Sequence, residues 1–168
     1  MGGIMADLTN NQNFLQPTGY KITIERVNYP NLEFFVQSVQ HPSVSVPMTE
    51  VGYPRASVFM PGDKLVYDEV TFDLLLDEDM NAYIEMHNWL KRLVEDKVRG
   101  ASERPLQVPT TADITLTLLS SHNNVTKQFI YRDCVPTNIG GVQMTSNVTD
   151  VAYINVPMGF AFTYFDIV

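Results

Sequence analysis

The stretch that decides the fold is residues 66–98, VYDEVTFDLLLDEDMNAYIEMHNWLKRLVEDKV. Its first eleven residues alternate with a period of two, so Val70, Phe72 and Leu74 fall on one face of a strand. Acidic residues follow where a helix dipole favours negative charge, and basic residues collect where it favours positive charge. Apolar residues recur between them at helical spacing. This stretch therefore predicts a strand that leads directly into one helix at about 78–98.

Shorter alternating runs on both sides of this stretch predict further strands. The first two runs are expected to pair as a hairpin or meander, and the Asp-Cys-Val-Pro-Thr-Asn segment at 133–138 is expected to break a strand. The fold class is therefore predicted to be mainly β, an antiparallel β-sandwich or barrel that carries a single α-helix. The expected strands are 20–25, 32–37, 66–76, 113–118, 125–131, 142–144, 149–156 and 160–166.

The length of 168 residues suits one domain. Residues 1–17 are polar, lack periodicity and are expected to form a flexible or docking N-terminal arm. Residues 18–168 are expected to form a single β domain with an extended loop at 41–63.

The loop at 41–63 contains four prolines and two glycines, yet it is too apolar for a solvated linker. Two interpretations remain open: the loop folds back over its own core, or it buries its side chains against another protein. We favour the second, because long loops in compact domains are often functional. The residues assigned to this contact are Val44, Val46, Val51, Tyr53, Phe59 and Met60.

Composition excludes several functions. Eleven basic against nineteen acidic residues give a net charge of −8, which argues against tight wrapping of nucleic acid. No apolar run approaches the ~20 residues of a transmembrane helix, so we expect no membrane contact. Cys134 is the only cysteine and is interpreted as a structural thiol, and the three histidines show no metal-ligand spacing.

Candidates for catalysis are weak. Asp77 and Asp79 stand two residues apart at a predicted helix start, where a capping role is the better interpretation. His87 is interpreted as a partly buried histidine with a hydrogen-bond partner. We therefore assign no catalytic, cofactor-binding or metal-binding residue, expect no cofactor, and do not expect an enzyme.

Basic residues crowd the end of the predicted helix. They lack the interleaved aromatic array of a single-strand nucleic-acid site, so a solvated helix end or an acidic protein partner is favoured. Trp89 lies beside them and is either core or an interface anchor. The outer surface of the helix is accordingly assigned to Trp89, Lys91 and Arg92.

The order of elements resembles the tail tube proteins of contractile-tailed bacteriophages, which are related in fold to baseplate tube initiators and to the type VI secretion tube protein. Three patterned stretches carry the resemblance, and none of them has a chemical signature. They are the strand-to-helix junction at 67–90, the Pro-Thr-Asn turn within 133–140, and the aromatic C-terminal stretch at 151–165.

This resemblance implies a tail-tube-like fold and a structural virion protein. Such proteins form hexameric rings that stack into the inner tail tube, a conduit for the tape-measure protein and for DNA during ejection. The resemblance also implies that the loop, with the contact residues assigned to it above, forms an inter-ring or inter-subunit contact. Implied partners are further copies of the chain, the tail sheath, the tape-measure protein and the baseplate tube initiator, while DNA passes without specific binding. The implied location is the virion tail, after assembly in the host cytoplasm.

An acidic, hydroxyl-rich lumen would repel DNA, and the residues expected to contribute to it are Glu69, Asp73, Asp113 and Asp150. Two alternatives to a repeated tube subunit stay open. The first is a baseplate tube initiator or tail terminator ring of the same tube. The second is a small-ligand-binding β-barrel or an enzyme, which would need an enclosed cavity with convergent polar groups.

Overall fold

The computed structural model describes residues 14–147 and 153–168, except residues 26, 35 and 99–108. Within this part the chain is mainly antiparallel β, as predicted, but it carries two helices instead of one. The elements are β1 (Tyr20–Thr23), α1 (Pro30–Phe34), β2 (Val36–Gln40), β3 (Val44–Ser45), β4 (Met48–Tyr53), β5 (Ala56–Pro61), β6 (Val66–Tyr67), β7 (Val70–Leu75), α2 (Asn81–Val98), β8 (Ala112–Leu119), β9 (Val125–Ile139), β10 (Asn155–Ala161) and β11 (Tyr164–Ile167).

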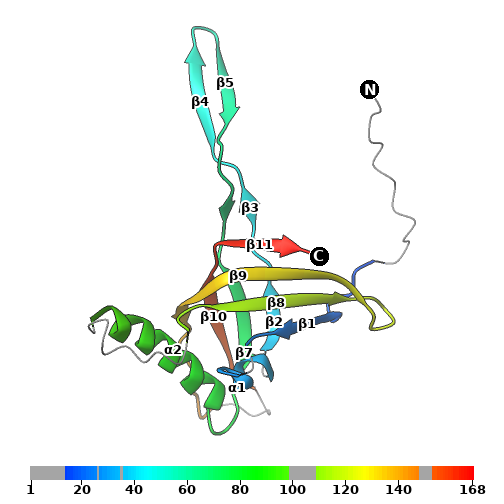
Figure 1. Cartoon of the computed structure of the whole chain (residues 1–168), viewed down its shortest axis with the longest axis vertical. Coiled ribbons are helices and arrows are strands. Elements are labelled where there is room, and N and C mark those ends of the chain that lie inside the picture. Colours follow the sequence, from blue (N-terminus) through cyan, green and yellow to red (C-terminus); the bar gives the residue numbers. More distant parts are fainter. Residues whose placement is uncertain (1–13, 26, 35, 99–108, 148–152) are drawn as a thin grey trace.

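Seven strands form the body of the molecule, in the order β1-β8-β9-β10-β7-β2, with β11 also paired to β9. The long strand β9 belongs to two layers. Its first part pairs with β8 and β11, and its last part pairs with β10. We call the layer of β1, β8, β9 and β11 the β8 sheet, and the layer of β9, β10, β7 and β2 the β7 sheet. Figure 1 shows the strands of the two sheets crossing at a steep angle.

The predicted break at 133–138 is wrong, because β9 continues through this segment. Its turn-type residues mark a change of direction within the strand. Asp133 has a φ of 54°, in the left-handed region, and the register to β8 shifts between Ala112 and Ile114 directly opposite. Such an irregularity increases the local bend of a strand. One strand can thereby serve both sheets.

The core lies between the two sheets and α2. Val70, Phe72 and Leu74 are buried as their alternation predicted, and they meet the buried side of β10. The helix contributes Ala82, Met86 and Trp89, none of which is exposed. This three- and four-residue spacing is that of one helix face. The helix itself begins at Asn81 instead of 78, after a turn in which the Met80 N–H donates to the Asp77 carbonyl at 3.0 Å.

The predicted hairpin between 20–25 and 32–37 is wrong. β1 pairs with β8 and β2 pairs with β7, while residues 30–34 form the short helix α1. A tertiary contact overrides the alternating pattern, because the Asn31 and Leu32 N–H groups each donate to the Glu85 carboxylate of α2 at 3.2 Å. A carboxylate at a helix start that opens with proline stabilises that start.

The predicted C-terminal strands also differ in their bounds. Residues 142–144 form no strand, and β10 begins at Asn155 and extends to Ala161. The first half of the expected strand at 149–156 lies outside the described residues, and its last two residues belong to β10.

Candidate assembly surfaces

The first candidate surface is a two-stranded arm, residues 43–68, that projects from the body along the longest axis of the molecule (Figure 1). β3 and β6 form its root, where Val44 lies opposite Tyr67. β4 and β5 form its outer part in a continuous antiparallel register from Met48–Pro61 to Tyr53–Ala56. The stretch predicted as an irregular loop is therefore an ordered ribbon.

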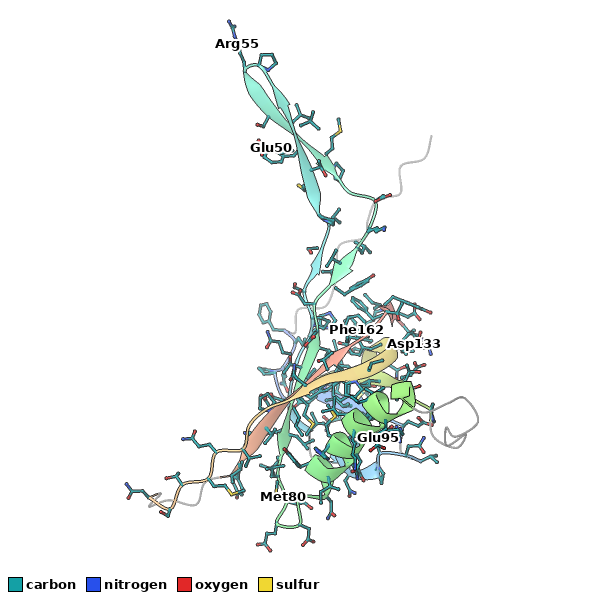
Figure 2. The ribbon with its side chains drawn as sticks, turned by 90° about the vertical axis from the view of Figure 1, so that its left-hand side faces the viewer. Glu50, Arg55, Met80, Glu95, Asp133 and Phe162 are labelled. Carbon is teal, nitrogen blue, oxygen red and sulfur yellow. The ribbon has the colours of Figure 1, made fainter. Side chains whose placement is uncertain are left out.

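Both faces of the outer arm carry apolar side chains, because paired residues alternate between them. One face, which we call the uncharged face, contains the Val51–Val58 and Thr49–Met60 pairs. The opposite face, called the Glu50 face, contains the Glu50–Phe59 and Met48–Pro61 pairs. The exposed fractions of the large apolar side chains are 66% for Met48, 42% for Val58, 63% for Phe59 and 51% for Met60. Figure 2 shows Glu50 part-way along the arm and Arg55 at its far end.

The residues predicted to make an inter-subunit contact all lie on this arm. Val44, Val46, Phe59 and Met60 are exposed and Val51 is half-buried, while the side chain of Tyr53 lies outside the described part. The alternative interpretation, in which the loop folds over its own core, does not hold for the four exposed side chains. Their assignment to a contact between subunits stays a prediction.

An aromatic cluster anchors the root of the arm to the body. The Tyr67 ring lies 5.6 Å from that of Phe162 and 5.5 Å from that of Phe165. Next to them, His41 Nδ1 lies 2.7 Å from the Tyr131 hydroxyl, in hydrogen-bonding contact. Burial lowers the pKa of His41, so the neutral imidazole is favoured in this setting.

The second candidate surface is the face of the β7 sheet that points away from the core. Glu69 and Asp73 both lie on it, on the phase opposite to the buried Val70 and Phe72. Glu69 Oε2 accepts a hydrogen bond from the Thr137 hydroxyl at 3.1 Å, and Asp73 accepts one from the Ser38 hydroxyl. The described residues of this face include no lysine or arginine, so it presents carboxylate, hydroxyl and amide groups.

Gly159 makes the polar cluster around Glu69 possible. A β-carbon at Gly159 would lie 2.7 Å from Asn138 Nδ2, 2.8 Å from Thr137 Oγ1 and 3.0 Å from Glu69 Oε2. The register of β10 to β9 shifts at this point, between Gly159 and Phe160. The bulge brings the side chains of two consecutive β9 residues to the same face, where a larger residue would displace them.

The four predicted lumen acids are not brought together as one set. Asp113 lies on the β8 sheet, where its carboxylate is 2.5 Å from Arg132 Nη1 and accepts the Asp133 N–H at 3.1 Å. The same guanidinium reaches Asp166 at 3.4 Å, and these carboxylates raise the pKa of Arg132. Asp150 lies outside the described residues. Glu69 and Asp73 are therefore the two that share a face.

The predicted outer surface of the helix needs correction. Trp89 is fully buried, with its ring 4.1 Å from Tyr29 in a stacked arrangement, and its indole N–H donates to the Thr110 carbonyl at 2.9 Å. Arg92 is half-buried and donates to the Tyr29 hydroxyl and to the Pro109 carbonyl. Lys91 alone of the three faces solvent, in an ion pair with Glu95 at 3.5 Å.

The candidates for chemistry stay apart. Cys134 is buried, and burial raises the pKa of its thiol to about 12, which leaves it inert at neutral pH. His87 is exposed, so its prediction as a partly buried residue is wrong. Among the described residues, no group of three or more His, Cys, Asp or Glu side chains is arranged to hold a metal ion.

Neither helix, over its described residues, is long and apolar enough to cross a membrane.

A shallow groove of about 570 Å³ lies between the edges of the two sheets. Its walls come from the segment before β1, from β2 and from the end of β8, and they include Leu15, Val39, His41 and Leu116. The Tyr20 hydroxyl crosses the groove to donate to the Gln37 carbonyl. The described lining contains no carboxylate and no basic residue other than His41.

No protein-family model and no curated protein matches the sequence. Solved structures do match the fold. A chain of the cryo-EM structure of the anti-feeding prophage cap, which terminates its tube, matches with a TM-score of 0.63 at 15% identity, over 99% of this chain and 98% of that one. A chain of the sixfold-symmetrised baseplate of the same particle matches with a TM-score of 0.62 at 8% identity, over 98% and 97%.

A chain of the sheath–tube complex of the extracellular contractile injection system PVC, in its extended state, matches with a TM-score of 0.59 at 12% identity. The match covers 93% of this chain and 92% of that one. At these identities the similarity establishes the fold over nearly the whole chain.

Proposed function

From this fold, which components of contractile injection particles share, we propose that the chain is a structural subunit that forms hexameric rings stacking into the inner tube of a contractile tail. The observation that carries the proposal is the arm: an exposed ribbon with apolar side chains, on a body that already has a complete core of its own. Exposed apolar surface of this kind marks a contact with another protein. Solved chains with the same fold come from a tube cap, a baseplate and a sheath–tube complex.

The edges of the β7 sheet suit the closure of a ring. Among the described strands, β2 pairs only with β7, so one edge of β2 is free. Past Cys134, β9 pairs with β10 but no longer with β8, so this part of β9 also has a free edge among the described strands. Exposed edges pair readily with another chain. Head-to-tail pairing of one edge with the other in the next copy is heterologous, and such contacts close into a ring when the rotation permits. The closed ring would join six β7 sheets into one barrel.

The outer face of the β7 sheet is then the proposed wall of the lumen. Its Glu69 and Asp73 carboxylates, with hydroxyl and amide neighbours, offer no cation to a phosphate backbone. DNA and the tape-measure protein would pass along it without specific binding. Asp113, already paired with Arg132, is not required for this role.

The sheath is proposed to meet α2, where Lys91 and the exposed Ile84 and Val94 face outward. The baseplate tube initiator would supply the first ring on which the tube grows. The chain would have no enzymatic role, would act in the tail of the virion, and would assemble in the host cytoplasm.

One alternative role has support of its own. Two of the matching structures are a baseplate and a tube-terminating cap, so an initiator or terminator ring of the same tube fits the fold as well. The number of copies in a particle separates these roles, because a tube subunit occurs in many rings and an end ring in one.

Negative-stain microscopy of the purified chain tests the proposal. Wild-type protein is expected to form rings or tubes. Val51→Asp with Val58→Asp places two carboxylates opposite each other on the arm, and this variant should stay folded, by circular dichroism, but fail to stack. Val125→Asp adds one such carboxylate to an exposed valine of the body and serves as the control. Featureless wild-type monomers at high concentration would argue against the proposal.

A further inference from the structure

We propose that Tyr20 protects the free edge of β2 against strand pairing in the unassembled chain, and that its hydroxyl must release the Gln37 carbonyl before a ring can close. The proposal rests on the proposed function, in which the edge of β2 pairs with an edge of the next copy. It adds how that pairing is regulated, and it assigns the regulation to one hydrogen bond.

The edge of β2 lacks the side chains that commonly protect an exposed strand. Its sequence, Val-Gln-Ser-Val-Gln at 36–40, contains no charged residue and no proline, although charges and prolines are the usual means of blocking an edge. An unprotected edge also pairs with the same edge of another copy, and such a contact gives a closed dimer instead of a ring. Productive assembly therefore benefits from another form of protection at β2.

An irregularity in β2 leaves Gln37 outside the pairing with β7. Val36 lies opposite Leu74 and Ser38 lies opposite Asp73, so the register shifts between them and Gln37 has no partner residue on β7. The Ser38 hydroxyl donates to the Asp73 carboxylate, which holds the strand on β7 directly after the irregularity. A bulge of this kind interrupts the ladder of hydrogen bonds. The backbone of Gln37 is thereby left for a donor from elsewhere.

Tyr20 supplies that donor from the other sheet. It opens β1, where it pairs with Leu118 of β8, and its hydroxyl crosses the groove between the sheets to donate to the Gln37 carbonyl. Figure 1 shows β1 and β2 next to each other. The Tyr20 ring is half-buried and packs against the core, so the hydroxyl is held at the edge of β2. A strand that approaches this edge has to displace it.

The hydroxyl stays a donor at neutral pH. Burial, together with the charge of Asp73, raises the pKa of Tyr20. An ionised phenolate could not donate to a carbonyl, so this shift favours the form that makes the hydrogen bond. The protection of the β2 edge is therefore present under the conditions in which copies of the chain would meet.

Protection of one edge is sufficient to regulate a ring. Each head-to-tail contact uses one β2 edge and one edge of another strand, so a hydrogen bond at β2 in every copy acts on every contact. Strand pairing would replace the Tyr20 hydroxyl by a backbone N–H of the next copy. The loss of one hydrogen bond corresponds to about a fivefold change in an association constant. A contact along the whole edge overcomes a change of this size more easily than a short, accidental one does.

Removal of a single hydroxyl group tests the proposal. Tyr20→Phe deletes the donor and keeps the ring in the core, while Tyr153→Phe deletes the hydroxyl of a tyrosine that is 76% exposed and serves as the matched control. Sedimentation and negative-stain microscopy measure the protein concentration at which rings or tubes form. We expect this threshold to fall about fivefold for Tyr20→Phe and to stay at the wild-type value for Tyr153→Phe.

The outcomes separate the proposal from the proposed function. An unchanged or raised threshold for Tyr20→Phe, in preparations that still form rings, overturns the protective role and leaves the proposed function standing. A lower threshold accompanied by loss of the β signal in circular dichroism would identify unfolding as the cause, and would also overturn the protective role. Absence of rings from the wild type and from both variants at high concentration overturns the proposed function, and the protective role with it.

A second variant tests whether the effect arises at the edge of β2. Tyr20→Phe combined with Gln37→Lys removes the hydrogen bond and places a lysine, a common protector of edges, at an exposed position of the same strand. This double variant is expected to return the threshold to the wild-type value or above it. Assembly of the double variant as readily as Tyr20→Phe alone would show that the hydroxyl acts elsewhere and would overturn the proposal.

Discussion

The arm and the body share the same alternating strand pattern but differ in whether their apolar side chains are buried. Phe59 on the arm and Phe72 in the body both lie on antiparallel strands with a period of two, yet Phe59 is 63% exposed and Phe72 is 1% exposed. The body strand is covered by α2 and by the second sheet, while the arm has no such layer among the described residues. An alternating strand pattern therefore predicts which residues form an apolar face. Burial of that face within the same chain stabilises the fold, whereas its burial against another chain would stabilise an assembly.

The largest expected effect is a loss of stability in the core of the body. Trp89→Ala removes a fully buried ring, its stack on Tyr29 and its hydrogen bond to Thr110. The expected loss in free energy of unfolding is about 3–5 kcal/mol. Urea denaturation of the monomer, followed by circular dichroism, measures it.

The matched change on the arm sharpens the contrast. Phe59→Ala is expected to alter monomer stability by no more than about 0.5 kcal/mol, because the ring has little cover to lose. A loss approaching that of Trp89→Ala would mean that the arm packs on its own body in solution.

A change of intermediate size is expected on the polar face of the body. Gly159→Ala inserts a methyl group among Glu69, Thr137 and Asn138, and should cost about 1–3 kcal/mol by forcing these side chains apart. Gly141→Ala is the control, since a β-carbon there meets nothing within 4 Å. Equal thermal denaturation midpoints for the two variants would contradict the tight packing over Gly159.

The smallest effect is expected where the arm joins the body. Burial lowers the pKa of His41, so the unfolded chain binds this proton more readily than the folded one. Stability should therefore fall as the pH drops from about 6.5 through the lower folded pKa of His41, and this contribution should level off below it. His41→Gln should flatten the fall between about pH 7 and about pH 5.5, while His122→Gln, at an exposed turn residue, should not. Parallel curves for wild type and His41→Gln would exclude His41 as the source.

The sequence predicted the core elements well because their patterns are local. Alternation in β7 and helical spacing in α2 each follow from one amphipathic element facing one core. The apolar content of the arm was visible for the same reason, without knowing its geometry, while the role of these residues in a contact stays a prediction. The ordered ribbon was missed because four prolines and two glycines are typical of loops. In the structure the prolines lie at strand ends, in the turn or between strands, and Gly52 lies within β4, paired with Ser57.

The failures share a different physical cause, contacts between residues far apart in sequence. The start of α1 depends on Glu85, more than fifty residues away in the chain. The pairing of Asp113 with Arg132 depends on the register of β8 and β9, which no single strand pattern reveals. Trp89 could not be assigned to core or surface by its spacing, because its ring packs against Tyr29 and Phe160, which are both distant from it in the sequence.

The pairing of β1 with β8 has a consequence for how the protein is made. Tyr20 can meet its partner Leu118 only after most of the chain has left the ribosome, whereas the two strands of the arm are neighbours in sequence. We therefore expect the apolar strands of the arm to be exposed on the nascent chain before its body has closed. Glu50 and the prolines at 47, 54 and 61 are residues of the kind that protect such ribbons from premature association. Order of synthesis, as well as shape, then helps to decide when copies of this chain meet.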